Sequence, residues 1–150
     1  PAQIDQVFWD NAAPAPPTEG IEEFLEYLHE KGIRTGVISN ITYDGEVVKN
    51  RINTLLPNNH FEFIIATSDY LFRKPNRRIF QFALQRADLQ PEDVWYIGDQ
   101  YEADIKGAQG AGLTPVWYQG AIDLPFAPDE SVLTVQSWEQ LREIMDEQGV

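Results

Sequence analysis

Two periodicities alternate along this chain and constrain its fold more than any other feature. Apolar residues recur at i, i+3, i+4 and i+7 from Ile21, which predicts an amphipathic helix over residues 20–31. Residues 61–67 (FEFIIAT) form a continuous apolar run, which predicts a strand buried on both faces of a sheet. Strands that alternate with helices belong to parallel sheets with crossover helices. The chain is therefore predicted to be an α/β protein, a three-layer Rossmann-like sandwich with a parallel sheet.

The same alternation continues through the rest of the chain. Strands are expected over residues 33–39, 61–67, 93–98, 113–118 and 132–135, the last at an edge of the sheet. Helices are expected over residues 20–31, 47–56, 76–87 and 102–112, and after Ser137. Gly32 and Pro57 are natural stops for the first two helices. Ser137, with Gln140 three residues later, has the capping-box pattern that begins a helix.

Composition excludes several classes of function. The net charge of −13 disfavours nucleic acids and anionic membrane surfaces as partners, because both require clustered basic residues. The chain has no cysteine, which excludes disulfides, thiolate catalysis and cysteine-based metal sites. No apolar stretch approaches the ~20 residues that span a bilayer. These features are compatible with the cytoplasm, which is the location we expect.

Polar side chains follow three of the predicted strands where each strand ends. Ser39 and Asn40 come after the first strand, Lys74 follows the second, and Asp99 and Asp104 come after the third. The carboxyl ends of parallel strands meet at one edge of a sheet, where ligands bind. Hydroxyl and backbone N–H groups hold phosphate oxygens, a lysine neutralises developing charge, and paired carboxylates suit Mg²⁺. The combination predicts phosphoryl chemistry.

Each of these residues also has a plainer interpretation. The two aspartates could be a solvated helix N-terminus, where the helix dipole favours acids. Ser39 could cap a turn, and Lys74 could belong to a solvated basic face together with Arg77 and Arg78. Pro75 gives Lys74 a defined direction, which favours a functional role for the lysine. The Lys74–Pro75 bond is a candidate for a cis peptide.

Three motifs in this order and spacing resemble those of the haloacid dehalogenase-like hydrolases, mostly Mg²⁺-dependent phosphatases. They are an apolar strand ending in Ser39-Asn40, a Lys74-Pro75 pair ahead of a helix, and Gly98-Asp99 with Asp104 five positions on. The resemblance covers roughly residues 18–118.

The resemblance implies a role for each of these residues. Ser39 and the Asn40 amide would bind the substrate phosphate, and Lys74 would bridge the nucleophile and the phosphate. Asp99 and Asp104 would form the metal site. Asp99 would ligate Mg²⁺, and Asp104 would act through water or by orienting Asp99 and Lys74.

One motif of that family is not found. The family's first strand carries an Asp-x-Asp whose first aspartate is the nucleophile that forms an aspartyl-phosphate. The only candidate here is Asp10, which lacks the second aspartate. We therefore expect residues 1–17 to be a linker returning from a cap domain, and residues 18–150 to be the core without its first strand. The gap beside the Ser39 strand would be filled by an N-terminal segment of the same protein, as a separate chain or from a swapped protomer.

The resulting expectation is a Mg²⁺-dependent phosphatase of a small phosphorylated metabolite, inactive as this fragment alone. Two alternatives stay open. One is a non-catalytic or regulatory module that binds phosphate and Mg²⁺, as receiver domains do, although their acids precede the lysine in sequence. The other is a metal-independent haloacid dehalogenase of the same fold. A homo-oligomer is compatible with either.

Overall fold

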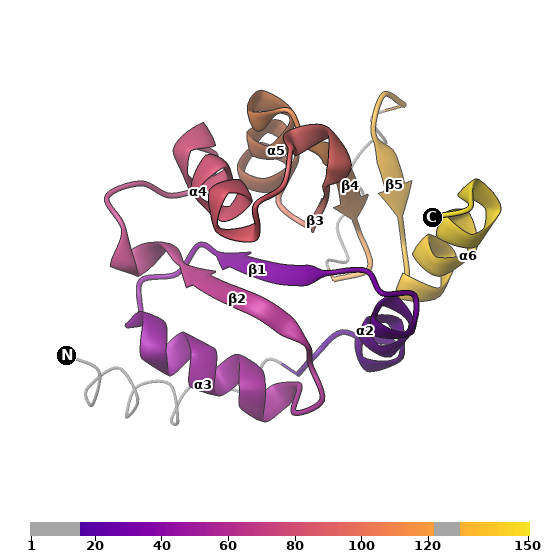
Figure 1. Ribbon diagram of the computed structural model, residues 1–150, viewed down its shortest axis with the longest axis horizontal. Helices are drawn as coiled ribbons and strands as arrows, with labels where there is room; N and C mark the ends of the chain where they lie inside the picture. The colour runs from indigo at the N-terminus through magenta and orange to yellow at the C-terminus, as the bar shows by residue number, and fades with distance from the viewer. Residues whose placement is uncertain (1–15, 122–129) are drawn as a thin grey trace. The chain divides into compact units, whose positions relative to one another are not determined.

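The computed structural model describes residues 16–121 and 130–150, so Asp10 and most of the predicted linker over residues 1–17 lie outside it. The described chain forms two compact units (Figure 1). The first unit contains Ile21–Arg73, and the second contains Thr18–Gly20 and Lys74–Val150. None of the helices within the described ranges has the length and apolarity needed to cross a membrane.

The first unit is a parallel strand pair with its helices. Its elements are α2 (Ile21–Glu30), β1 (Thr35–Ser39), α3 (Gly45–Leu55), β2 (Phe61–Ala66) and the 3₁₀ turn η1 (Thr67–Asp69). β1 and β2 run parallel, and α3 packs against β2 (Figure 1). The predicted strand 33–39 begins two residues late. The reason is that the Ile33 N–H donates to the Leu28 carbonyl, closing the C-terminus of α2 around Gly32 at φ +72°.

The second unit is a three-stranded parallel sheet with its helices. Its elements are α4 (Arg77–Ala87), η2 (Pro91–Asp93), β3 (Trp95–Gly98), η3 (Tyr101–Lys106), α5 (Gly107–Ala111), β4 (Thr114–Tyr118), β5 (Leu133–Val135) and α6 (Trp138–Gln148). The strand order is β3-β4-β5, so β5 is at an edge, as predicted. Its core is formed by large side chains that are fully buried: Ile79, Phe80, Ile105, Val116, Val135 and Leu141.

The predicted helix over residues 102–112 differs in type from the observed structure. Its first part is a π-helical turn, η3, and only Gly107–Ala111 is α-helical. Single π-helical turns within helices frequently occur at functional sites. The last helix begins after Ser137 as predicted, and the Ser137 hydroxyl caps it by accepting from the Gln140 N–H at 3.1 Å. The Gln140 side chain accepts from the N–H of Gln136, one residue before the position that a capping box uses.

All the strand pairs are parallel, which confirms the predicted α/β class. Within the described ranges, β1 pairs with β2 alone and β3 pairs with β4 alone, so the strands form two separate sheets. Both β1 and β3 are only partly buried along most of their length, although their sequences are largely apolar. Largely apolar strands are usually buried on both faces of a fully covered parallel sheet, and β1 and β3 differ from that pattern here.

Candidate functional site

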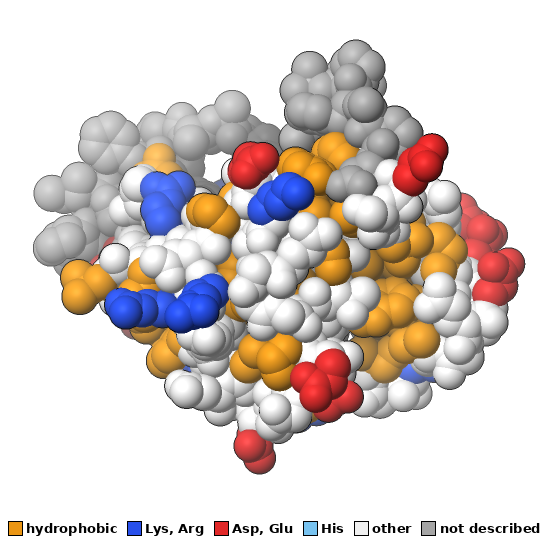
Figure 2. All heavy atoms as spheres, turned by 90° about the horizontal axis from the view of Figure 1, so that it is seen from above, with side chains coloured by type: hydrophobic (Ala, Val, Ile, Leu, Met, Phe, Trp, Pro, Cys, Tyr) orange, Lys and Arg blue, Asp and Glu red, His pale blue; other side chains and the backbone are white. Residues whose placement is uncertain are grey.

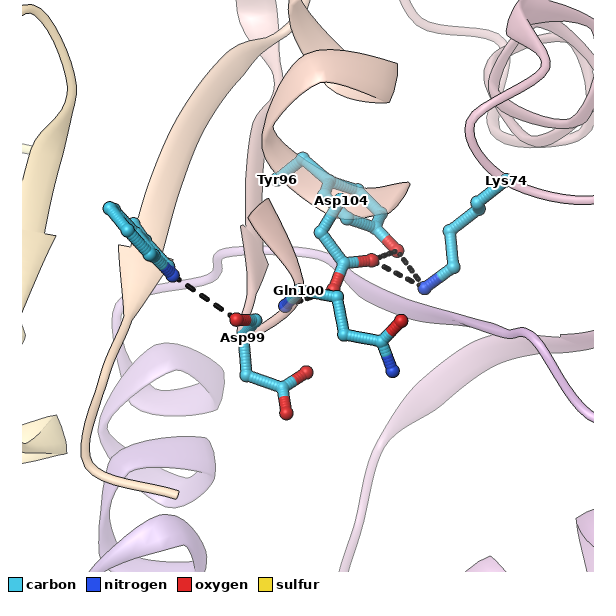
Figure 3. A network of polar contacts seen from close by, with 6 residues as sticks. Lys74, Tyr96, Asp99, Gln100 and Asp104 are labelled. Atoms are coloured by element: carbon cyan, nitrogen blue, oxygen red, sulfur yellow. Dashed lines mark hydrogen bonds and ion pairs between the residues drawn. The ribbon is translucent and has the colours of Figure 1, made fainter. Parts of the chain in front are cut away.

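Lys74 and Asp104 form a buried ion pair in the second unit (Figure 3). The Lys74 Nζ atom lies 2.6 Å from Asp104 Oδ1, and the two side chains are 9% and 4% exposed. Lys74 precedes helix α4, whose N-terminus is capped by the Asn76 side chain, and the Lys74–Pro75 peptide is cis. Asp104 lies within the π-helical turn η3. The predicted lysine and the second predicted carboxylate are therefore brought into direct contact.

Tyr96, which lies outside the three sequence motifs, completes this cluster. Its hydroxyl accepts a hydrogen bond from Lys74 Nζ at 2.9 Å and donates to Asp104 Oδ1 at 3.4 Å. Burial, together with the negative charges of Asp104 and Asp99, raises the pKa of Tyr96 well above its usual range. Tyr96 is on β3 two residues before Gly98, so both face the same side of the sheet. The two-residue spacing from Gly98 was the one signal in the sequence that could have identified Tyr96. A tyrosine within an apolar strand is more readily interpreted as a core residue.

The turn that follows β3 holds Asp104 in place. The second carboxylate oxygen of Asp104, Oδ2, accepts from the backbone N–H of Gln100 at 2.9 Å. A Cβ atom at Gly98 would overlap the Cβ and Cγ atoms of Asp104, so only glycine permits this approach. The predicted Gly98-Asp99…Asp104 motif therefore has a direct packing reason for its glycine and its spacing.

Asp99 is held through its backbone rather than through its carboxylate. The Trp117 indole N–H donates to the Asp99 carbonyl at 3.1 Å, and Trp117 lies buried on the neighbouring strand β4. The Asp99 carboxylate points away from the contacts between Lys74 and Asp104 (Figure 3). The Trp117 side chain therefore both packs in the core and fixes the backbone of Asp99.

The carboxylates of this site are compatible with Mg²⁺ binding when water, phosphate or other segments supply most of the ligands. Both oxygens of Asp104 already accept hydrogen bonds, which leaves the Asp99 carboxylate as the oxygen donor directed away from the cluster. No group of three or more His, Cys, Asp or Glu side chains suited to a metal occurs in residues 16–121 and 130–150. Mg²⁺ commonly takes one or two carboxylates and completes its octahedron with water and phosphate oxygens. Asp99 fits that pattern, and Asp104 fits an orienting role.

The remaining predicted residues lie in the first unit or at the surface. Ser39 ends β1 and Asn40 follows it, so both stand at the carboxyl end of that strand, as the sequence indicates. They belong to the first unit, whereas Lys74, Asp99 and Asp104 belong to the second. Arg77 and Arg78 are exposed, as expected of a solvated basic face, and Figure 2 shows basic side chains among the exposed groups of one face.

Comparison with known proteins places these motifs in a family. The model of the haloacid dehalogenase-like hydrolase family matches residues 9–118. The chain is 30% identical over 130 residues to haloacid dehalogenase-like hydrolase domain-containing protein 3 of Mus musculus, covering 85% of this chain and 51% of that protein. It is 35% identical over 91 residues to a glyceraldehyde 3-phosphate phosphatase of Methanothermobacter thermautotrophicus, covering 59% of this chain and 38% of that protein.

A solved structure shows the same fold. The protein YfnB of Bacillus subtilis, in a structure bound to magnesium, superposes with a TM-score of 0.72 at 24% identity, covering 85% of this chain and 55% of that one. The present chain thus spans about half the length of the mouse protein and of YfnB. The family model covers most of the chain and includes all three motifs found in the sequence. This chain belongs to the haloacid dehalogenase-like hydrolase family.

Proposed function

We propose that this chain is part of a Mg²⁺-dependent phosphatase that hydrolyses a small phosphorylated molecule through an aspartyl-phosphate. The observation that carries the proposal is the buried Lys74–Asp104 pair, together with Asp99, which directly follows β3 and whose carboxylate points away from that pair. Relatives that include a glyceraldehyde 3-phosphate phosphatase support phosphate-ester chemistry over other reactions of the family. The magnesium in the YfnB structure supports the choice of metal.

Each residue has a role in this proposal. The Lys74 ammonium group neutralises charge on the nucleophile and on the phosphoryl oxygens, and Asp104 holds that ammonium in place. Asp99 holds Mg²⁺, which supplies positive charge to the phosphate oxygens when it is bound. Ser39 and the Asn40 amide bind the phosphate, because the carboxyl ends of parallel strands are where ligands are bound in open α/β sheets.

The nucleophile comes from a segment other than residues 16–121 and 130–150. In the described part of the chain, β1 and β3 have one partner strand each and are partly exposed. An apolar strand with an open edge is prone to pair with another strand. We infer that a strand ending in the nucleophilic aspartate pairs at such an edge, contributed by an N-terminal segment of the same protein. This segment would be a separate chain or part of a second protomer.

A phosphatase assay on the complete protein tests this function. p-Nitrophenyl phosphate with Mg²⁺ should be turned over by the wild type, and Asp99→Asn should abolish the turnover. Asp88→Asn is the matched control: Asp88 is an exposed aspartate of the same unit, at φ +55°, a backbone conformation that asparagine also adopts. Equal turnover by Asp99→Asn and wild type would reject the assignment of Asp99. Metal-independent release of halide from a 2-haloacid, without phosphatase activity, would favour the dehalogenase alternative.

A further inference from the structure

We propose that Tyr96 is a positioning residue that fixes the direction of the Lys74 ammonium group. The proposal deepens the proposed function, because it assigns the residue that aims the lysine at the phosphoryl group. Only the expected effect on the reaction rate rests on the proposed function. The contact itself can be tested without any substrate.

The three groups form a closed triangle of hydrogen bonds. Lys74 Nζ donates to Asp104 Oδ1 at 2.6 Å and to the Tyr96 hydroxyl at 2.9 Å, and that hydroxyl donates to the same Asp104 oxygen at 3.4 Å. The Tyr96 hydroxyl therefore accepts from the lysine while donating to its counter-ion. This use of both its functions defines the orientation of the hydroxyl.

Packing within the second unit restricts the Tyr96 ring. Tyr96 lies on β3 opposite Pro115 of β4, and its ring packs edge-on against Phe80 at a centroid distance of 5.0 Å and an interplanar angle of 78°. Phe80 is fully buried in the core of the unit. Lys74, in contrast, carries its charge on a flexible four-carbon stem. A rigid acceptor at the end of a packed ring therefore restricts a group that would otherwise have rotational freedom.

Removing the hydroxyl changes the direction of the lysine but leaves its charge in place. The ammonium would keep its short contact to Asp104 and would turn toward that carboxylate. A catalytic charge accelerates a reaction only when it is correctly positioned against the reacting atoms, so even a small displacement of the ammonium group lowers the rate. The loss should fall on kcat, since the substrate in its ground state depends less on the exact lysine position.

The kinetic test uses Tyr96→Phe in the complete protein, which keeps the ring and removes only the hydroxyl. kcat for p-nitrophenyl phosphate should fall about tenfold, as for the loss of one hydrogen bond to a charged group, while KM changes less than about twofold. Tyr118→Phe is the matched control. Tyr118 is buried on β4 with its ring stacked on Trp138 and lies outside the cluster, so this variant should keep the wild-type kcat. Equal kcat in Tyr96→Phe and wild type would overturn the kinetic role.

The second test observes the lysine directly by ¹⁵N NMR of the ammonium groups. The wild type should show a Lys74 signal protected from rapid proton exchange, identified by its disappearance in Lys74→Arg. Tyr96→Phe should shift this signal and accelerate its exchange, and Tyr118→Phe should leave it unchanged. An unaltered Lys74 signal in Tyr96→Phe would overturn the inference whatever the rates. A wild type without phosphatase activity but with the expected NMR change would instead reject the proposed function and retain the Tyr96 contact.

Discussion

The Nζ atom of Lys74 lies 2.6 Å from Oδ1 of Asp104, and both side chains are almost completely buried although 30 residues separate them. An ion pair withdrawn from water depends on mutual compensation, because removing one partner leaves an unpaired buried charge. The stability of the second unit therefore depends on both partners being present, and the pair is also the proposed source of positive charge for catalysis. The exposed pair between Arg34 and Glu62, also at 2.6 Å, provides a contrast within the same chain.

A double-mutant cycle should separate these two kinds of ion pair. Lys74→Met leaves the Asp104 charge buried, so the free energy of unfolding should fall by about 3–5 kcal/mol. Asp104→Asn should be similarly costly, and the double variant should lose clearly less than the sum of the two. Urea unfolding of the complete protein measures all three variants.

The exposed pair serves as the control for that cycle. The effects of Arg34→Ala and Glu62→Ala should be close to additive, because solvent screens the pair. Additive effects of Lys74→Met and Asp104→Asn would contradict the mutual dependence of the buried pair.

Gly98→Ala should disturb the Asp104 turn. Its new Cβ atom would overlap Asp104 Cβ and Cγ, so Asp104 must move away from Lys74 and from the Gln100 N–H. We expect a loss of about 1–3 kcal/mol in the free energy of unfolding, typical of an overpacked site, together with loss of phosphatase activity.

Gly110→Ala is the matched glycine control. Gly110 lies in α5, and a Cβ atom there meets nothing within 4 Å. The free energy of unfolding should therefore rise by about 0.5–1 kcal/mol, because alanine restricts the unfolded chain more than glycine does. A Gly98→Ala variant as stable and as active as the wild type would show that Asp104 does not need this close approach.

Mg²⁺ should stabilise the complete protein through Asp99. A cation that binds only the folded state raises its stability, by about 2.7 kcal/mol at a free concentration a hundredfold above Kd. The melting temperature of the wild type should therefore rise with MgCl₂ relative to NaCl of equal ionic strength. Asp99→Asn should abolish this rise and Asp88→Asn should retain it. A rise of equal size in Asp99→Asn would place the metal elsewhere.

Alkaline pH should reveal the burial of Tyr96. Its pKa is raised in the folded state by burial and by the charges of Asp104 and Asp99, whereas in the unfolded chain it ionises near its ordinary pKa of about 10. The neutral hydroxyl therefore contributes fully below about pH 10, and its contribution is lost as the pH rises toward the folded-state pKa.

The measurement is urea unfolding at about pH 9 and about pH 11. The free energy of unfolding should fall more steeply over this interval in the wild type than in Tyr96→Phe, which lacks the titrating group. An identical slope in the two proteins would mean that the Tyr96 pKa is not raised by folding.

Local sequence signals were sufficient for the class of fold and for the approximate positions of its main helices and strands. The 3.6-residue periodicity from Ile21 and the apolar run 61–67 each correspond to an observed element, α2 and β2. Such patterns report burial on one or both faces, which is a property of neighbouring residues. The π-helical turn over Tyr101–Lys106 was missed, because it differs from an α-helix only in its hydrogen-bond register.

The sequence by itself determined the α/β class, the strand ends and the candidates Lys74, Asp99 and Asp104, because spacing and turn chemistry are local properties. The tertiary structure showed that Asp104 contacts Lys74 directly, and it alone decided that Tyr96 joins them and that Trp117 holds the Asp99 backbone. These contacts join residues 18 to 30 positions apart. They depend on strand register and on how the helices pack against the sheet, and neither is specified by any short stretch of the chain.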